Sequence, residues 1–161
     1  IPINGKFNEE EKAIYDLVYQ AQEAGIAISK PGTTFQEIDA AGRQIINDGL
    51  AKLGIIKKGE GHQYFPHGTS HHIGLDVHDR GTRNPIQVGM VFTIEPGIYI
   101  PIGSDCDEKW WGIAVRIEDD ILITEEGAVN LSGDAPRTVA AIEEMMRLPS
   151  VLEEWVLPEI D

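Results

Sequence analysis

The chain has 161 residues, of which 42% are apolar, a composition typical of one globular domain with a hydrophobic core. Its formal net charge of -14 argues against nucleic acid or an anionic membrane surface as a partner, because both are bound by clustered Lys and Arg. A single cysteine, Cys106, excludes an intrachain disulfide and makes a reducing, cytoplasmic setting the expectation. No apolar run approaches the ~20 residues that a membrane-spanning helix needs.

Two amphipathic helices are predicted in the first third of the chain. The first runs from Asn8 to about Ile28, and the second from Thr34 to near Gly54. Asn8 and Thr34 are each followed three residues later by a glutamate, which is the capping-box pattern. Each helix has one apolar stripe that we expect to face the core. The stripes are Ile14, Leu17, Val18, Ala21 and Ala24 in the first helix, and Ile38, Ala41, Ile45, Ile46 and Leu50 in the second.

From about residue 60, strand patterns replace the helical ones. Three strands and a last helix are predicted, at Val91–Ile94, Ile98–Ile100, Ile113–Thr124 and Thr138–Met146. Pro96-Gly97 separates the first two strands, and a bulge at Asp119-Asp120 is one option for the third. Helices followed by strands, without strict alternation, indicate an α+β fold with an antiparallel or mixed sheet.

Four of the five histidines lie between residues 67 and 79, interleaved with glycine and aspartate. These four are His67, His71, His72 and His78. Imidazoles bind transition metals and transfer protons near neutral pH. The segment therefore indicates either a metal or catalytic site or, alternatively, a histidine-rich surface loop. The fifth histidine, His62, is expected at the surface.

Two glutamates stand on strands that are otherwise apolar on one face. Alternation places Thr93 and Glu95 on the same face, with Glu95 at the strand end, either exposed or held in a site. In the later strand, Arg116 and Glu118 lie opposite an apolar face at positions 113, 115 and 117. They point into an open cleft if that apolar face packs on the helices, or they form a solvated polar face. One histidine with Glu95 and Glu118 is a ligand set for Mn²⁺, Zn²⁺, Co²⁺ or Fe²⁺, and its oxygen content favours Mn²⁺.

Three segments together resemble the signatures of the pita-bread metallopeptidases, most closely those of the Xaa-Pro aminopeptidase (aminopeptidase P) and prolidase family. They are residues 67–79, 93–97 and 116–120, with weaker support from residues 4–7, 30–32 and 130–132. The resemblance runs over nearly the whole chain in the expected order. It implies a pita-bread fold, in which helices pack on a curved, mainly antiparallel sheet.

The resemblance implies a metal site. Members of that family use two divalent ions held by two Asp, one His and two Glu. The corresponding ligands here are His71, Glu95 and Glu118, with Glu118 bridging both ions. The expected ions are Mn²⁺, with Zn²⁺ or Co²⁺ as alternatives. Glu95, beside the bridging water, is expected to accept its proton.

Other positions correspond to residues that contact substrate in that family. His67 and His78 are expected to bind substrate and to stabilise the developing tetrahedral intermediate. Tyr99 and Arg116 are expected to line the cleft near the bound proline. His72, directly after the ligand, should point elsewhere, as a pocket wall or a structural residue.

The two Asp ligands have no convincing counterpart in this chain. In the family they lie on a hairpin that ends just before a turn like Asn4-Gly5-Lys6-Phe7. We therefore expect residues 1–161 to be the C-terminal part of an incomplete catalytic domain, without the N-terminal domain and the Asp-bearing hairpin. Such a chain should have little activity alone. Its exposed sheet edge should be covered by another copy, giving a homo-oligomer.

The expected activity of the longer enzyme is release of the N-terminal residue from peptides with proline in the second position. One alternative is a prolidase, which acts on Xaa-Pro dipeptides only. Others are a non-catalytic binding module and a metal-free hydrolase of the creatinase type on the same fold. Retention of all five of His67, His71, His78, Glu95 and Glu118 argues against a binding module and, less strongly, against the creatinase type.

Overall fold

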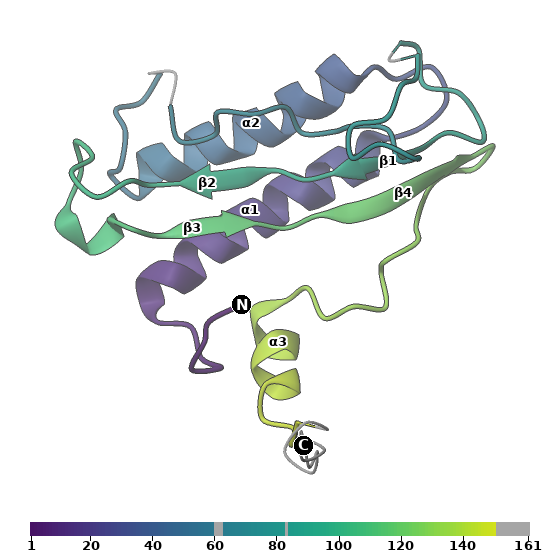
Figure 1. The fold of residues 1–161 in the computed structure, drawn as a ribbon. Helices are drawn as coiled ribbons and strands as arrows, with labels where there is room; N and C mark the ends of the chain where they lie inside the picture. The colour runs from purple at the N-terminus through teal and green to yellow at the C-terminus, as the bar shows by residue number, and fades with distance from the viewer. Residues whose placement is uncertain (60–62, 83, 151–161) are drawn as a thin grey trace, which may run out of the picture.

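The computed structural model describes residues 1–59, 63–82 and 84–150, so the predicted surface position of His62 falls outside the described residues. In this part of the chain two long helices come first, five short strands follow, and a short helix comes last (Figure 1). The elements are α1 (Glu9–Ile28), α2 (Phe35–Lys52), β1 (Val91–Ile94), β2 (Gly97–Tyr99), the 3₁₀ turn η1 (Glu108–Trp110), β3 (Ala114–Arg116), β4 (Asp119–Thr124), β5 (Gly127–Asn130) and α3 (Val139–Met145).

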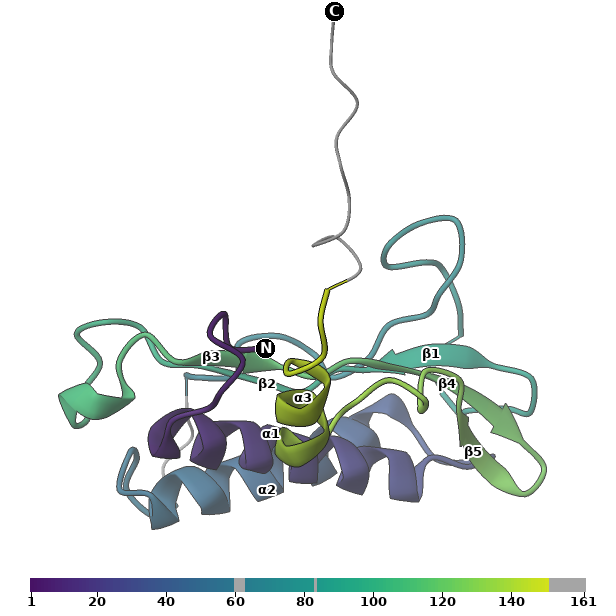
Figure 2. The ribbon, with the colours of Figure 1, turned by 90° about the horizontal axis from the view of Figure 1, so that it is seen from below.

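The helices and the strands form two layers. α1 and α2 lie side by side and cover the same face of the strands, whereas part of the segment before β1 rises from the opposite face (Figure 2). Strands pair only in antiparallel fashion in the described structure. Within the described residues, none of the helices is long and apolar enough to cross a membrane.

Both long helices begin at the predicted capping boxes. The Asn8 side chain accepts a hydrogen bond from the Glu11 backbone N–H at 2.7 Å, and Glu11 Oε2 accepts one from the Asn8 N–H at 2.9 Å. Thr34 and Glu37 form the same reciprocal pair at the start of α2. Each box satisfies N–H groups that have no partner inside the helix, and an N-cap is worth about 1 kcal/mol. The two helix starts predicted from the sequence are therefore confirmed.

The four central strands form two short ladders that share one register. β1 pairs with β4, placing Ile94 opposite Asp119, and β2 pairs with β3, placing Gly97 opposite Arg116. The same register continued through the gap places Glu95 opposite Glu118. The two ladders are thus consecutive parts of one long antiparallel hairpin with a break in the middle (Figure 1).

The prediction of one continuous strand from residue 113 to residue 124 is wrong. The chain leaves strand geometry at Ile117 and Glu118, and β3 and β4 belong to different ladders. The physical reason lies on the partner strand, where Pro96 has no N–H to donate across the ladder. Only a long bond from the Ile117 N–H to the Pro96 carbonyl, at 3.4 Å, crosses the break.

A short strand, β5, was not predicted from the sequence. It pairs with β4 through a tight turn at residues 125–126, so that Thr124 lies opposite Gly127. Gly127 has a φ of +126°, which favours glycine because it lacks a Cβ atom. A Glu-Glu-Gly sequence directly after a strand is a weak hairpin signal, and the four-residue strand that follows has little apolar alternation.

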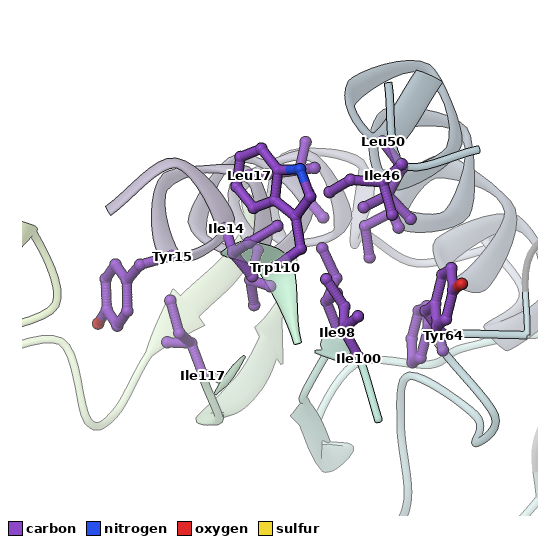
Figure 3. Close-up of a cluster of buried hydrophobic side chains, with 14 of the residues drawn as sticks. Ile14, Tyr15, Leu17, Ile46, Leu50, Tyr64, Ile98, Ile100, Trp110 and Ile117 are labelled. Carbon is purple, nitrogen blue, oxygen red and sulfur yellow. The ribbon is translucent and has the colours of Figure 1, made fainter. Parts of the chain in front are cut away.

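The core lies between the two helices and the strands. Figure 3 shows Leu17 of α1 and Leu50 of α2 packed against Ile98, Ile100 and other apolar side chains of the strand layer. Each such side chain contributes about 1.5–3 kcal/mol when fully buried. A second cluster, which includes Ile38, Phe92 and Ile94, lies under β1 and β4. Because Phe92 and Ile94 point to the helices, the alternate residues of β1 point to the other face.

A buried ionic cluster connects β4 to α1 and to the segment before α3. Asp119 is 2% exposed and lies 2.9 Å from the Arg137 guanidinium. Its oxygens also accept hydrogen bonds from Ser132 Oγ at 2.7 Å and Asn130 Nδ2 at 2.9 Å. Arg137 reaches on to Glu23 of α1 at 2.7 Å. This cluster fixes the start of β4, the residue directly after Glu118.

Candidate metal centre

Three of the predicted site residues converge on one point. His71 Nε2 lies 3.2 Å from Glu95 Oε1 and 3.5 Å from Glu118 Oε1. One ligand atom from each of the three residues lies within 4.8 Å of the other two. The Glu95 and His71 side chains are 11% and 14% exposed, and that of Glu118 is 37% exposed. The cluster is therefore largely shielded on one side and open to solvent at Glu118.

Backbone hydrogen bonds bring the three side chains together. Glu95 follows the end of β1, and Glu118 precedes the start of β4 at the opposite position of the register. His71 comes from the segment that lies along the other side of β1. There the Thr93 N–H donates to the His71 carbonyl at 2.9 Å, and the Glu95 N–H donates to the Thr69 carbonyl at 2.7 Å. The histidine segment, the residue after β1 and the residue before β4 thus each supply one candidate ligand.

The face predicted for Glu95 is correct, and Thr93 has a role that the sequence did not indicate. Thr93 Oγ1 accepts a hydrogen bond from the His71 N–H at 3.1 Å and lies 3.4 Å from Glu95 Oε1, to which it can donate. Thr93 is 1% exposed. A single buried hydroxyl therefore links the backbone of His71 to the carboxylate of Glu95. The only sequence signal for it is that Thr93 shares a strand face with Glu95.

The donor set fits a divalent cation. His71 Nδ1 lies 3.0 Å from the carbonyl oxygen of His72, which can only accept, so the proton is on Nδ1. With the proton on Nδ1, the neutral form of the ring would present the lone pair of Nε2 toward the two glutamate carboxylates. Three electron-rich atoms facing one another are complementary to a cation, and a histidine whose other nitrogen donates to a carbonyl is the usual arrangement of a metal ligand.

Arg116 lies beside the two carboxylates. Its Nε is 3.7 Å from Glu95 Oε2 and 3.9 Å from Glu118 Oε2. The side chain is 52% exposed, so solvent screens these interactions and they contribute little to stability. Arg116 and Glu118 share a strand face, as predicted, and Val115 and Ile117 pack toward the core on the other.

His67 and Tyr99 form a second polar group near the cluster. His67 Nδ1 lies 2.9 Å from the carbonyl of Gly68, so it carries the proton, and Nε2 can accept a hydrogen bond from the Tyr99 hydroxyl at 2.8 Å. The Tyr99 ring occupies the space beside Gly97, where an added Cβ atom would lie 2.7 Å from the hydroxyl oxygen. The absence of a side chain at Gly97 therefore lets Tyr99 reach His67.

The two remaining histidines of the segment lie on opposite sides of His71. The exposed ring of His78 packs edge-on against the His71 ring, with centroids 4.7 Å apart. His72 points away, donates from Nε2 to the Thr82 carbonyl at 3.0 Å, and packs against Phe35 of α2 at 5.3 Å. His72 is therefore a structural residue, one of the two options expected from the sequence, and His78 lies against the His71 ring of the cluster.

A separate groove follows the outer edge of β3, with a volume of about 460 Å³. Among the described residues, its lining includes Tyr15, Trp111 and Arg116, but not the three clustered ligand residues. Arg116 is thus the one predicted site residue that contacts both the groove and the carboxylates. The clustered donor atoms, and not this larger hollow, are the chemically distinctive feature of the molecule.

Comparison with known proteins identifies a family. Residues 1–125 match metallopeptidase family M24. The chain is 42% identical over 149 residues to the mitochondrial intermediate cleaving peptidase 55 of Arabidopsis thaliana, covering 90% of this chain and 30% of that protein. It is 39% identical over 158 residues to the Xaa-Pro aminopeptidase of Escherichia coli, covering 90% of this chain and 36% of that protein.

A solved structure shares the fold. Zinc-substituted aminopeptidase P of Escherichia coli, in complex with product, superposes with a TM-score of 0.86 at 39% identity, over 91% of this chain and 36% of that one. The predicted α+β pita-bread fold, here incomplete, is therefore confirmed. The chain spans about a third of the length of the relatives that it matches. On the family match and these identities together, the chain belongs to metallopeptidase family M24.

Proposed function

We propose that this chain supplies part of the divalent metal centre of a Xaa-Pro aminopeptidase, with His71, Glu95 and Glu118 as ligands. The observation that carries the proposal is the convergence of their donor atoms within 4.8 Å. A bound divalent ion would polarise the peptide carbonyl and lower the pKa of a coordinated water. The two carboxylates favour Mn²⁺, with Zn²⁺ or Co²⁺ as alternatives. In the longer enzyme we propose a second ion, held with ligands outside this chain and bridged by Glu118.

Glu95 is the proposed proton acceptor. Its carboxylate is mostly shielded from solvent, and Thr93 lies close enough to Oε1 to fix its orientation. A carboxylate held in one orientation beside an attacking water can take the proton from that water as the bond to carbon forms. Glu118 is more exposed and better suited to reaching a second ion.

Substrate contacts are proposed for the residues around the ligands. His67 and His78 lie on either side of His71 along the segment and would contact substrate and stabilise the developing tetrahedral intermediate. Tyr99 and Arg116 would line the cleft for the second residue of the peptide. The names of the relatives support proline at that position, since several of them are Xaa-Pro aminopeptidases.

The same proposal includes the place of this chain in a longer domain and its oligomeric state. Residues 1–161 would form the C-terminal part of a longer catalytic domain. β3 is hydrogen-bonded to a strand only on its β2 side in the described structure, and an unpaired edge favours association with another chain. A homo-oligomer is the assembly that we propose, and sedimentation of the longer protein would show whether it forms.

The test of function is peptide cleavage by the longer protein with Mn²⁺. We expect release of the first residue from a Xaa-Pro-Xaa tripeptide, with a matched Xaa-Ala-Xaa tripeptide as the control. Glu95→Gln should reduce kcat by roughly 10²–10⁴-fold, the usual contribution of a general base. Cleavage of a Xaa-Pro dipeptide alone would identify a prolidase instead. Equal cleavage of the two tripeptides would contradict proline specificity, and cleavage of neither would contradict the proposed aminopeptidase activity.

A further inference from the structure

Two residues of α2 form a charged pair that faces the histidine segment. Asp39 and Arg43 are one helical turn apart, and Arg43 Nε lies 2.6 Å from Asp39 Oδ2. Their side chains are 30% and 32% exposed, so as an isolated surface pair they would contribute little to stability. What distinguishes them is that Arg43 Nη1, Arg43 Nη2 and Asp39 Oδ1 each form a hydrogen bond with the segment that runs between α2 and β1.

The Arg43 guanidinium donates hydrogen bonds to the backbone of this segment. Nη1 donates to the Phe65 carbonyl at 2.9 Å, and Nη2 donates to the His67 carbonyl at 2.6 Å. The guanidinium also lies over the Phe65 ring, 4.3 Å from its centroid. Two parallel hydrogen bonds from a rigid planar group fix both the position and the direction of the chain. His67, which holds Tyr99, is thereby anchored to α2.

Asp39 extends the contact between α2 and the segment to Thr69, two residues after His67. Its Oδ1 accepts a hydrogen bond from Thr69 Oγ1 at 2.6 Å, and Thr69 is 2% exposed. On its other side, the Thr69 carbonyl accepts the Glu95 N–H at 2.7 Å. A continuous path therefore runs from the helix carboxylate, through the buried threonine, to the backbone of a proposed metal ligand.

The segment needs such support because it has little regular structure. Between residues 63 and 82 the backbone forms only isolated bridges, one of them from His72 to Phe92, so no continuous ladder fixes its orientation. An irregular segment has many accessible conformations, and ordering one residue costs about 1–2 kcal/mol. Side-chain hydrogen bonds from the residues of α2 offset that cost at His67 and Thr69.

We propose that Asp39 and Arg43 are positioning residues that hold His67, Thr69 and Glu95 in the geometry of the metal centre. The effect on metal affinity rests on the proposed function. The positioning of His67, Thr69 and Glu95 does not, because it concerns the chain without metal. Neither residue touches the ligand atoms. Both act through Thr69 and the backbone, as partners beyond the ligands do in other metal sites.

The experiment compares variants of α2 and of Thr69. Asp39→Ala removes the acceptor, Thr69→Val removes the hydroxyl at nearly constant volume, and Thr69→Ser keeps it. Asp48→Ala is the matched control, because Asp48 is an exposed acid of the same helix whose partner is Gln44. Circular dichroism establishes that each variant is folded before any comparison is made.

The first measurement is amide hydrogen exchange of Glu95 and Thr93 without metal. We expect Asp39→Ala and Thr69→Val to speed exchange at Glu95 about tenfold, as a locally loosened contact does, and Thr69→Ser and Asp48→Ala to leave it unchanged. Unchanged exchange in Asp39→Ala, or an equal effect of Asp48→Ala, would overturn the proposal. This readout does not depend on whether the chain binds a metal.

The second measurement is the affinity for Mn²⁺ by calorimetric titration. Asp39→Ala and Thr69→Val should bind about tenfold more weakly, which is the usual effect of losing a partner beyond the ligands, and Thr69→Ser should restore the affinity. Faster exchange with unchanged Mn²⁺ affinity would overturn the link to the metal. If the parent chain itself bound no Mn²⁺, the three ligands would not suffice without those outside this chain, while the exchange data would still decide the positioning role.

Discussion

Glu95 lies opposite Glu118 at the point where two antiparallel ladders of the same register are interrupted. Two like charges at facing positions destabilise a regular sheet, and here His71 Nε2 lies within 3.5 Å of both carboxylates and Arg116 Nε within 3.9 Å. Pro96 provides the break because it cannot donate across the ladder. The feature that interrupts the hairpin is therefore also the feature that gathers the proposed ligands.

Gly97→Ala should separate Tyr99 from His67. The new Cβ atom would lie 2.7 Å from the tyrosine hydroxyl oxygen and 2.9 Å from Cε2, so the ring has to move. We expect the 2.8 Å contact between His67 Nε2 and the hydroxyl to be lost, at a cost of about 1 kcal/mol. A crystal structure of the variant measures this distance directly.

Gly68→Ala is the control for this change, since an added Cβ there meets nothing within 4 Å. It should leave the contact between His67 and Tyr99 in place. Tyr99→Phe removes the same hydrogen bond without moving the ring. An unmoved tyrosine in Gly97→Ala would show that the glycine is not what allows the contact.

Asp119→Ala should be strongly destabilising. It would remove the buried acceptor of Asn130 Nδ2 and Ser132 Oγ, and would leave the Arg137 guanidinium with Glu23 and Gln22 as its remaining partners. Breaking a buried pair from one side costs about 3 kcal/mol or more. Urea unfolding followed by circular dichroism gives the free energy of unfolding of the variant and of the parent.

The matched variant is Glu144→Ala, which breaks an exposed pair with Arg147 at 3.0 Å. Pairs of this kind contribute roughly 0–1 kcal/mol. Similar losses of stability in Asp119→Ala and Glu144→Ala would mean that the cluster around Asp119 is no more than a surface ion pair.

Tyr15 should ionise at a pH well above the ordinary pKa of a tyrosine. Burial raises its pKa to about 12 from an ordinary value of 10.0, partly offset by the positive charge of Arg137. The hydroxyl also donates to the Arg137 carbonyl at 2.9 Å. Because the folded chain keeps this proton longer than the unfolded chain, the stabilisation is fully present below pH 10 and is lost as the pH rises toward about 12.

Ultraviolet titration of phenolate, in the parent and in Tyr15→Phe, isolates this group. The difference between the two curves should have its midpoint near 12. The free energy of unfolding of the parent should fall more steeply between pH 10 and pH 12 than that of Tyr15→Phe. A difference curve centred near 10 would contradict the burial argument.

The features predicted correctly from the sequence are those that depend on local patterns. Capping boxes fixed the starts of α1 and α2, and strand parity placed Glu95 with Thr93 and Arg116 with Glu118. These features depend on neighbours a few residues away. They suffice to place Glu95 and Glu118 on the correct faces of their strands.

Features that depend on contacts distant in sequence were missed. The split of residues 113–124 into β3 and β4 depends on Pro96 of the facing strand, which alternation within one strand cannot show. The contact of Asp39 with Thr69 joins residues 30 positions apart. On a helical wheel, Asp39 is one more polar residue beside an apolar stripe. Its role becomes visible only once α2 and the histidine segment are side by side.

The most direct test of the central claim is anomalous diffraction from crystals of the chain grown with Mn²⁺. We expect a manganese peak roughly 2.0–2.3 Å from His71 Nε2 and from one carboxylate oxygen each of Glu95 and Glu118, the range of metal–ligand bonds in such sites. The peak should be absent in His71→Ala crystals grown in the same way. A manganese ion bound elsewhere, with no peak among these three residues, would contradict the assignment of the metal centre.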